Sequence, residues 1–254
     1  MEDAEEVLWI VPCWRDWEDC GFGSSQVDPA LAGRAYQHWH LADELSRSKN
    51  QNEITRGTVV QKLWNAVDAR VRLLNDEYRL RQLSRAAAWP GRPDTLAILT
   101  QLGLVRPSAL RQLKDIRNSV EHQDRGAPAI ETCRSFVDTV WYFLRSTDIF
   151  VGSRITDFEL EDPWASDEGE PNHFVSFALD FQSWLPHIDG WLPAAAVSPT
   201  KLEAALSIKL DEPAQSQGGA VWVRGTVRDG GTALEAVTHK YFLVNLPDGT
   251  RQIE

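Results

Sequence analysis

Between residues 28 and 150, apolar residues recur every three or four positions, the spacing that places them on one face of an α-helix. The most regular of these stripes predicts a helix that starts near residue 130; its members are Ile130, Cys133, Val137, Val140 and Leu144. A longer stripe predicts a second helix, which the sequence WPGRP at 89–93 should end because proline breaks helices. The longer stripe consists of Val60, Leu63, Val67, Val71, Leu74 and Tyr78.

Local signals mark the ends of two further helices. Asp28 followed by Pro29 is typical of a helix start, since proline is favoured in the first turn. A short helix is expected from Asp94 to about Leu102, with Gly103 just past its end. The apolar stripe of the helix that begins at Asp28 is Leu31, Ala35, His38, Ala42 and Leu45.

A fifth helix should begin near Pro107-Ser108 and end at the sequence DRGAP, residues 124–128. The side chains expected to face inward are Leu110, Leu113, either Ile116 or Arg117, and Val120. Five helices joined by short connections predict an antiparallel bundle over residues 28–150.

After residue 150 the pattern changes to short runs of branched and aromatic residues between glycine, proline and aspartate. Four runs predict strands: RITDFELED, HFVSFALDF, GAVWVRGTV and EAVTHKYFLVNLP. The sequence RDGG between the last two predicts a hairpin turn. SPTKLEAAL predicts a short helix capped by Ser198. The fold class is therefore multidomain, α and α+β: a helical bundle followed by a small, mostly antiparallel β-rich domain at 151–254.

Charge is distributed unevenly over these segments. Residues 1–27 carry one basic and seven acidic side chains, 28–150 carry 18 basic and 14 acidic, and 151–254 carry seven basic and 16 acidic. Only the middle segment has a positive net charge, so only this segment favours a polyanion such as RNA. The candidate RNA-binding residues are Arg70, Arg72, Arg79, Arg81, Arg85 and Lys114. A solvated helix surface is the alternative interpretation of the arginine cluster.

The acidic segments suggest roles away from RNA. Residues 1–27 form an acidic, tryptophan-rich N-terminal arm, which either packs back on the bundle or docks a partner. GFGSS at 21–25 is interpreted as a linker. The 151–254 domain is a candidate partner or sensor module, which would put its negative charge away from any RNA groove.

No apolar run approaches the roughly 18 residues that a membrane helix needs, so no membrane partner is expected. Three widely spaced cysteines suit reduced thiols in the cytoplasm, and the start MEDAEE is unlike a secretion signal. Cys13 and Cys20 lie too far apart in sequence for a usual zinc loop. We therefore expect no metal and no cofactor. His38 lies on an apolar stripe and is expected to be a core residue.

The sequence KDIRNSVEHQD at 114–124 concentrates polar chemistry at the end of the fifth helix. Asn118 and His122 are four residues apart and share a face, whereas Arg117 and His122 are separated by about 140° on an ideal helix. Arg117 and Glu121 are also four apart. One interpretation is that Arg117 and Glu121 form an ion pair, and that His122 interacts favourably with the helix dipole at the C-terminal end.

The other interpretation comes from a resemblance. Arg117-Asn118 followed by His122 at the end of the penultimate bundle helix resembles the R-x-x-x-x-H signature of HEPN domains, over residues 28–150 at most. The resemblance implies a metal-independent endoribonuclease, a toxin or antiviral defence effector, with Arg117, Asn118 and His122 as catalytic residues. A catalytically silent HEPN scaffold that binds RNA or a protein partner is the alternative.

Cleavage by 2′-hydroxyl attack needs a base on one side of phosphorus and an acid on the other. Arginine offers a permanent cation for phosphoryl oxygens, and histidine exchanges protons near neutral pH. The motif supplies one histidine per chain, so a homodimer through the bundle with a composite site is expected. The resemblance also implies a dimer, because HEPN domains are often dimeric. It further implies a possible inhibitory partner such as an antitoxin.

Overall fold

The computed structural model describes residues 6–105, 108–122, 126–164, 171–229 and 233–244. The chain divides into two compact units, and each is described by itself. The helical unit consists of residues 26–80 and 93–154, and the β unit consists of 1–25, 81–92 and 155–254. The described residues combine helices with a mostly antiparallel sheet, as predicted, but the sheet is larger than the small β-rich domain expected from the sequence.

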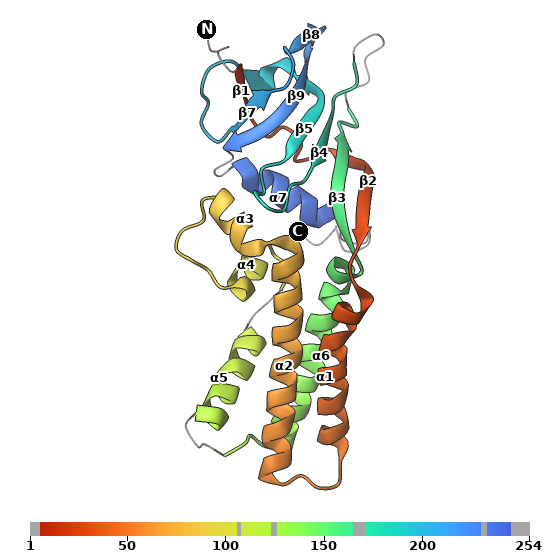
Figure 1. Ribbon diagram of the computed structural model, residues 1–254, viewed down its shortest axis with the longest axis vertical. Helices are drawn as coiled ribbons and strands as arrows, with labels where there is room; N and C mark the ends of the chain where they lie inside the picture. Colours follow the sequence, from red (N-terminus) through yellow and green to blue (C-terminus); the bar gives the residue numbers. More distant parts are fainter. Residues whose placement is uncertain (1–5, 106–107, 123–125, 165–170, 230–232, 245–254) are drawn as a thin grey trace. The chain divides into compact units, whose positions relative to one another are not determined.

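The helical unit contains three long helices packed along one another and two shorter ones (Figure 1). The long helices are α1 (Pro29–Arg47), α2 (Glu53–Tyr78) and α6 (Ile130–Gly152). The shorter helices are α4 (Thr95–Gln101) and α5 (Ser108–His122), and α5 packs against α2 and α6. The predicted bundle helices are therefore all present.

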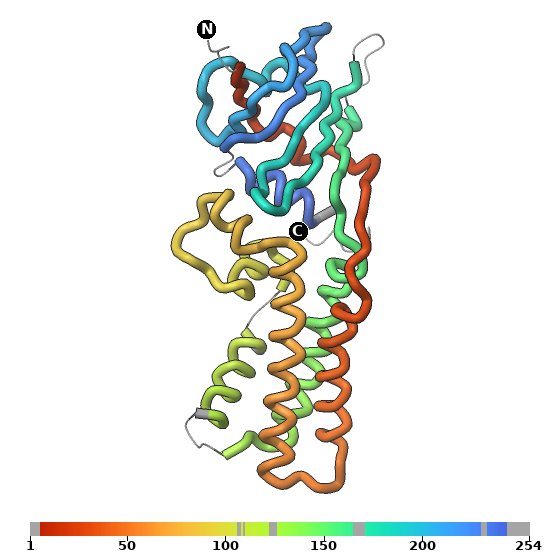
Figure 2. The backbone as a smooth tube through the Cα atoms, viewed as in Figure 1, coloured from red at the N-terminus to blue at the C-terminus, as the bar shows by residue number. Residues whose placement is uncertain are grey.

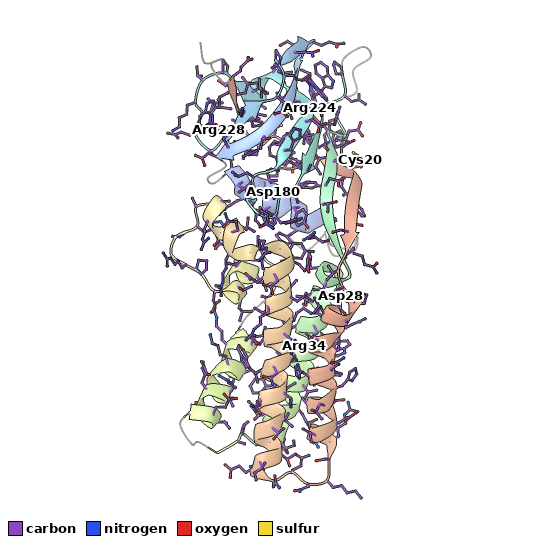
Figure 3. The ribbon with its side chains drawn as sticks, viewed as in Figure 1. Cys20, Asp28, Arg34, Asp180, Arg224 and Arg228 are labelled. Carbon is purple, nitrogen blue, oxygen red and sulfur yellow. The ribbon has the colours of Figure 1, made fainter. Side chains whose placement is uncertain are left out.

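The predicted helix starts are confirmed by their capping geometry. The Asp28 carboxylate accepts a hydrogen bond from the Ala30 amide at 2.8 Å, at the start of α1 (Figure 3). Asp94 does the same for the Ala97 amide at 2.8 Å. Gly103 follows α4 with a positive φ of 74°, which glycine adopts without a steric penalty.

The core of the helical unit lies between α1, α2 and α6. Its fully buried apolar members include Ala42, Val59, Leu63, Val67, Leu74, Cys133, Val140 and Leu144. His38 is half-buried, and burial lowers its pKa, with Lys62 and Arg34 nearby adding to the effect. His38 is thus a flanking residue of this core.

The long helix ends earlier than predicted. Arg79 has a left-handed conformation with φ 46°, which terminates α2 after Tyr78. A separate short helix, α3 (Leu80–Ala86), follows, and from residue 81 onward it belongs to the β unit. The prediction of one helix continuing to WPGRP is therefore wrong.

Within its described residues, the β unit is built on one nine-stranded sheet. The strand order is β2-β3-β4-β5-β9-β7-β1-β6, with β8 paired to β9, and the pairs from β3 to β6 along this order are antiparallel. The strand bounds are β1 Val7–Ile10, β2 Glu18–Gln26, β3 Ser153–Glu161, β4 Phe174–Ala178, β5 His187–Pro193, β6 Val197–Ser198, β7 Leu206–Leu210, β8 Gln215–Gln217 and β9 Ala220–Asp229. A 3-10 turn, Ala194–Ala196, precedes β6.

One face of the sheet packs against helix α7 (Ala233–Val244). Tyr241 lies 5.9 Å from Phe158 between ring centroids, and its hydroxyl donates to the Ile155 carbonyl at 3.0 Å. Phe158 stacks on Phe177 at 5.0 Å, and Trp14 meets Phe177 edge-on at 5.0 Å. These rings form the core of the β unit.

Two secondary-structure predictions in this region are wrong. The run EAVTHKYFLV is predicted to be a strand, but it forms α7, so RDGG does not connect two hairpin strands. SPTKLEAAL does not form a helix: Val197–Ser198 pairs with β1, Ala204 has a positive φ of 52°, and β7 begins at Leu206. In both places packing into the β unit overrides local propensity.

The interpretation of residues 1–27 as a separate arm differs from the structure. Strand β1 lies between β7 and β6, so the N-terminal segment joins the sheet formed by the C-terminal half of the chain (Figure 2). The predicted linker GFGSS lies within β2, which neighbours β3. In the described part of the chain, no helix has the length and apolar character that would let it cross a membrane.

Candidate active site on helix α5

Helix α5 presents the motif at its C-terminal end. Leu110 and Leu113 are buried and hold the helix against the rest of the helical unit. Near the motif, a methyl group built on Gly57 of α2 would meet Val120 Cγ1 at 3.7 Å, so α2 and α5 approach closely here. The end of α5 therefore rests on α2.

Arg117 is engaged by two neighbours on its own helix. Its Nη2 lies 2.5 Å from Glu121 Oε2, and its Nη1 donates to Asn118 Oδ1 at 3.0 Å. The Arg117 side chain is 29% exposed. Its Nε is enclosed and has no hydrogen-bond partner among the described residues. The Arg117–Glu121 ion pair, which the first interpretation of the motif predicts, is therefore present.

His122 is the last residue of α5, but its side chain lies outside the described residues. The position of the His122 side chain relative to Arg117 is therefore not described. In the described residues, one arm of the Arg117 guanidinium is bonded to Asn118, and the other arm is paired with the Glu121 carboxylate. Such a guanidinium can donate hydrogen bonds to phosphoryl oxygens once the carboxylate is displaced.

Arg70 is not an RNA-binding residue. It is 1% exposed and lies inside the helical unit. Its Nη1 donates to the Leu144 carbonyl and to Thr147 Oγ1, both at 2.9 Å, and its Nη2 lies 3.0 Å from Asp148 Oδ1. A guanidinium held in this way serves the core, so the prediction of an RNA contact at Arg70 is wrong.

The other predicted RNA-binding residues are divided between the two units. Arg72 is exposed and pairs with Asp68 at 2.9 Å, whereas Arg79 caps α2. Arg81 and Arg85 are exposed on α3, which belongs to the β unit. Because α2 and α3 are separate helices, Arg70 does not share a continuous helix with Arg81 and Arg85.

Lys114 is the one predicted RNA-binding residue on α5 itself. It is 46% exposed, and its Nζ lies 3.9 Å from Asp94 Oδ2. A pair this long and exposed contributes about 0–1 kcal/mol, so water or a phosphate can replace the carboxylate. Lys114 lies one helical turn before Asn118, which places it on the same side of α5 as the motif.

The sequence reasoning missed the partners of Arg70. Tyr36 donates its hydroxyl proton to Asp148 Oδ2 at 2.7 Å and lies under the Arg70 guanidinium, 5.7 Å from its carbon to the ring centroid. Burial raises the pKa of Tyr36, as does its bond to Asp148. The apolar spacing does predict that Arg70 is buried, because position 70 lies on the same helix face as Leu63, Val67 and Leu74.

Comparisons with protein-family models, with curated proteins and with solved structures find no match to this chain.

Proposed function

We propose that the protein is a metal-independent endoribonuclease of HEPN type that uses Arg117, Asn118 and His122. The observation that carries the proposal is a half-exposed guanidinium bonded to Asn118 in the last turns of an amphipathic helix that ends at His122. The helix belongs to a compact helical unit, in keeping with the resemblance. The role as a toxin or antiviral defence effector rests on the resemblance alone.

In the proposed reaction, the ribose 2′-oxygen forms a bond to the adjacent phosphorus while the bond from phosphorus to the 5′-oxygen breaks. The 2′-hydroxyl proton passes to one base, and the leaving 5′-oxygen receives a proton from one acid. His122 of each of two chains would fill these roles across a two-fold axis, and Arg117 would stabilise the charge on the phosphoryl oxygens.

Replacing His122 with alanine is expected to reduce RNA cleavage by roughly 10²- to 10⁴-fold, the usual contribution of a positioned proton-transfer group. The measurement is cleavage of a labelled RNA in the presence of a chelator, with the products analysed for a 2′,3′-cyclic phosphate end. His40→Ala is the matched control, because His40 is exposed on α1 of the same unit. Equal loss in both variants, or cleavage only with added metal, would contradict the proposal.

The second candidate is a silent scaffold that binds RNA without cutting it. The Arg117–Glu121 pair favours this candidate, since the carboxylate occupies the guanidinium that a phosphate would need. RNA binding by the wild-type protein without any cleavage would support the scaffold. Light scattering tests the dimer separately, and a monomer that still cleaves RNA would remove the composite site.

Glu121→Gln is expected to tighten RNA binding by up to about fivefold, because a partly exposed ion pair contributes about 0–1 kcal/mol that a phosphate must overcome. The measurement is the dissociation constant for a short RNA at two salt concentrations. Asp115→Asn removes one exposed carboxylate from the same helix and controls for net charge. An equal gain in both variants would mean that Arg117 is not the phosphate contact.

A further inference from the structure

The sheet of the β unit has a second face, opposite the core that contains Phe158 and Phe177. Along β5, the buried residues alternate with four half-buried ones that lie on this second face: His187, Asp189, Trp191 and Pro193. Paired residues on neighbouring strands share a face, so the strand register identifies the rest of this surface.

One row across the second face is aromatic and ends in a carboxylate. Glu161 pairs with Phe174, Phe174 with Trp191, and Trp191 with Trp222. The Trp222 ring lies 5.8 Å from Trp191 and 6.1 Å from Phe174 between centroids. All three rings are half-buried, so part of each remains open to a ligand.

The next row carries two carboxylates. It runs through Glu159, Ser176, Asp189 and Arg224, and Arg224 is its one basic member. Cys20 on β2 reaches the same surface, because its thiol donates to Glu159 Oε1 at 3.3 Å. Cys20 and Arg224 mark the two sides of this surface in Figure 3.

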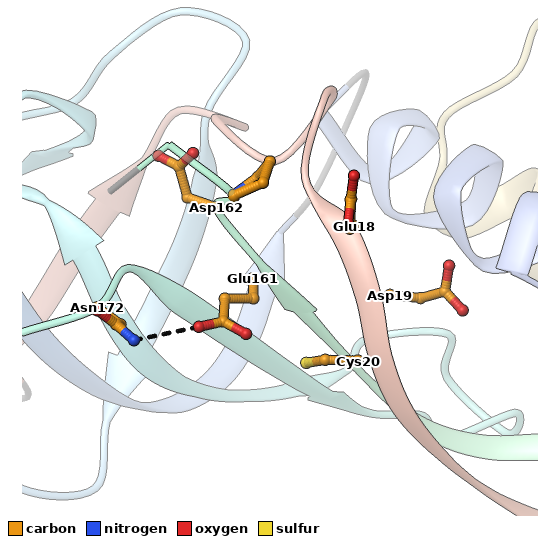
Figure 4. A pocket seen from close by; sticks show the side chains of 7 residues that line it. Glu18, Asp19, Cys20, Glu161, Asp162 and Asn172 are labelled. Atoms are coloured by element: carbon orange, nitrogen blue, oxygen red, sulfur yellow. Dashed lines mark hydrogen bonds between the residues drawn. The ribbon is translucent and has the colours of Figure 1, made fainter. Parts of the chain in front are cut away.

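A cavity of about 260 Å³ adjoins the carboxylate end of the aromatic row (Figure 4). Its lining comprises Glu18, Asp19, Cys20, Glu161, Asp162, Pro163 and Asn172. Four of these carry carboxylates, and none of these described residues is basic. Asn172 donates to Glu161 Oε1 at 3.2 Å, and His173 Nδ1 lies 3.7 Å from Asp162 Oδ2.

The field beside Cys20, at the carboxylate end of this surface, is negative. Burial and the carboxylates of Glu159 and Glu161 raise the pKa of the Cys20 thiol to about 12, which disfavours a further anion. Among the described residues, no group of three or more histidine, cysteine or acidic side chains is arranged to hold a metal ion. The carboxylates are spread along the surface, which suits a longer cationic ligand.

The dimensions favour an extended peptide. Three strand spacings separate Glu161 on β3 from Trp222 on β9, a distance of about 14 Å at 4.8 Å per strand. An extended chain advances about 3.3 Å per residue, so about four residues cover this distance. Arginine can stack its planar guanidinium on tryptophan and also pair with a carboxylate. Exposed Trp164, directly after the cavity residue Pro163, adds an aromatic side chain beside the site.

We propose that this acidic aromatic surface (Glu159, Glu161, Phe174, Asp189, Trp191 and Trp222, with the adjoining cavity) binds an extended, arginine-containing segment of a partner protein. One arginine side chain enters the cavity beside Glu161, and another stacks on Trp191 and Trp222. The negative charge of the β unit then serves partner recognition. The proposal does not depend on RNA cleavage, so it survives or fails independently of the ribonuclease function.

The test is fluorescence anisotropy of a labelled peptide of alternating arginine and glycine, titrated with the full chain. A peptide in which neutral citrulline replaces each arginine is the matched probe, and a lysine version separates stacking from charge. We expect the arginine peptide to bind, the lysine peptide to bind more weakly, and the citrulline peptide not to bind. Added salt should weaken binding because the carboxylates are partly exposed.

Two variants locate the binding site. Trp191→Ala is expected to weaken binding about five- to thirtyfold, the range of a desolvated cation–π contact. Glu161→Gln should weaken it severalfold while keeping an oxygen for the Asn172 hydrogen bond. Glu203→Gln, at an exposed turn of the same unit, should leave binding unchanged. Trp191→Phe keeps a ring and should bind nearly as well as wild type, which separates loss of stacking from loss of folding.

Three results would overturn the proposal. The first is no binding of the arginine peptide. The second is an equal effect of Glu161→Gln and Glu203→Gln, which would indicate attraction to net charge alone. The third is self-association of the chain that Glu161→Gln abolishes, because a second copy would then occupy the surface.

Discussion

Arg70→Ala is expected to lower the free energy of unfolding of the helical unit by about 2–4 kcal/mol, because it removes a buried side chain together with its hydrogen bonds. Asp148 is 32% exposed and keeps its ion pair with Arg145, so no isolated buried charge is left. The substitution removes a guanidinium that bonds the Leu144 carbonyl, Thr147 and Asp148 at 2.9–3.0 Å. It also leaves a cavity next to the Tyr36 ring. Urea unfolding, together with hydrogen exchange resolved by unit, measures the loss.

Arg72→Ala is the matched control for Arg70. Arg72 lies two residues further along the same helix, and its ion pair with Asp68 is exposed, with side-chain exposures of 75% and 38%. The expected change is within about 0.5 kcal/mol. Where Arg70→Ala remains folded, its RNA affinity should equal that of wild type. A variant with unchanged stability and weakened RNA binding would restore the RNA-contact interpretation of Arg70.

The contrast between buried Arg70 and exposed Arg72 could be predicted from the sequence. The stripe Leu63, Val67 and Leu74 leaves a gap that position 70 fills, so periodicity places Arg70 inside and Arg72 outside. Both residues were predicted to bind RNA because only their charge was considered. The partners on α6 follow the same logic, because Asp148 lies four residues after buried Leu144. Two helix starts were equally predictable, because Asp28 and Asp94 are typical N-cap residues.

The misassigned helix α7 had a readable signal as well. Its buried residues Leu234, Val237, Thr238, Tyr241 and Phe242 follow the helical three-four spacing. The β-branched and aromatic composition of the run favoured a strand, and the period was the better guide. For SPTKLEAAL the local signal does favour a helix, and pairing of the flanking residues with β1 decides against it.

Other features depend on contacts between residues far apart in the sequence. Val7–Ile10 pairs with residues 197–198 and 206–209, and nothing in the sequence VLWI indicates that register. Likewise, the row of Phe174, Trp191 and Trp222 comes from three strands separated by loops. At the motif, the spacing of Arg117 and Glu121 predicted their ion pair, and the catalytic role of His122 remains a prediction.

Gly190→Ala is expected to destabilise the β unit by about 3 kcal/mol, at the upper end of the usual cost of overpacking a core. A Cβ on Gly190 would lie 2.1 Å from the Phe174 carbonyl oxygen and 2.8 Å from Val175 Cα. Both are backbone atoms of the neighbouring strand β4, so they cannot rotate away as a side chain would. The strands must separate, which weakens the ladder between β4 and β5.

Gly225→Ala should have a similar effect, because its Cβ would lie 2.1 Å from the Lys209 carbonyl oxygen of β7. Gly21→Ala is the matched control: Gly21 is also in a strand, but its Cβ would meet nothing within 4 Å. Its expected change is within about 0.5 kcal/mol. Thermal unfolding and hydrogen exchange of the sheet amides measure the three variants. Equal unfolding temperatures for Gly190→Ala and Gly21→Ala would contradict this prediction. They would mean that β4 leaves room for a methyl group at position 190.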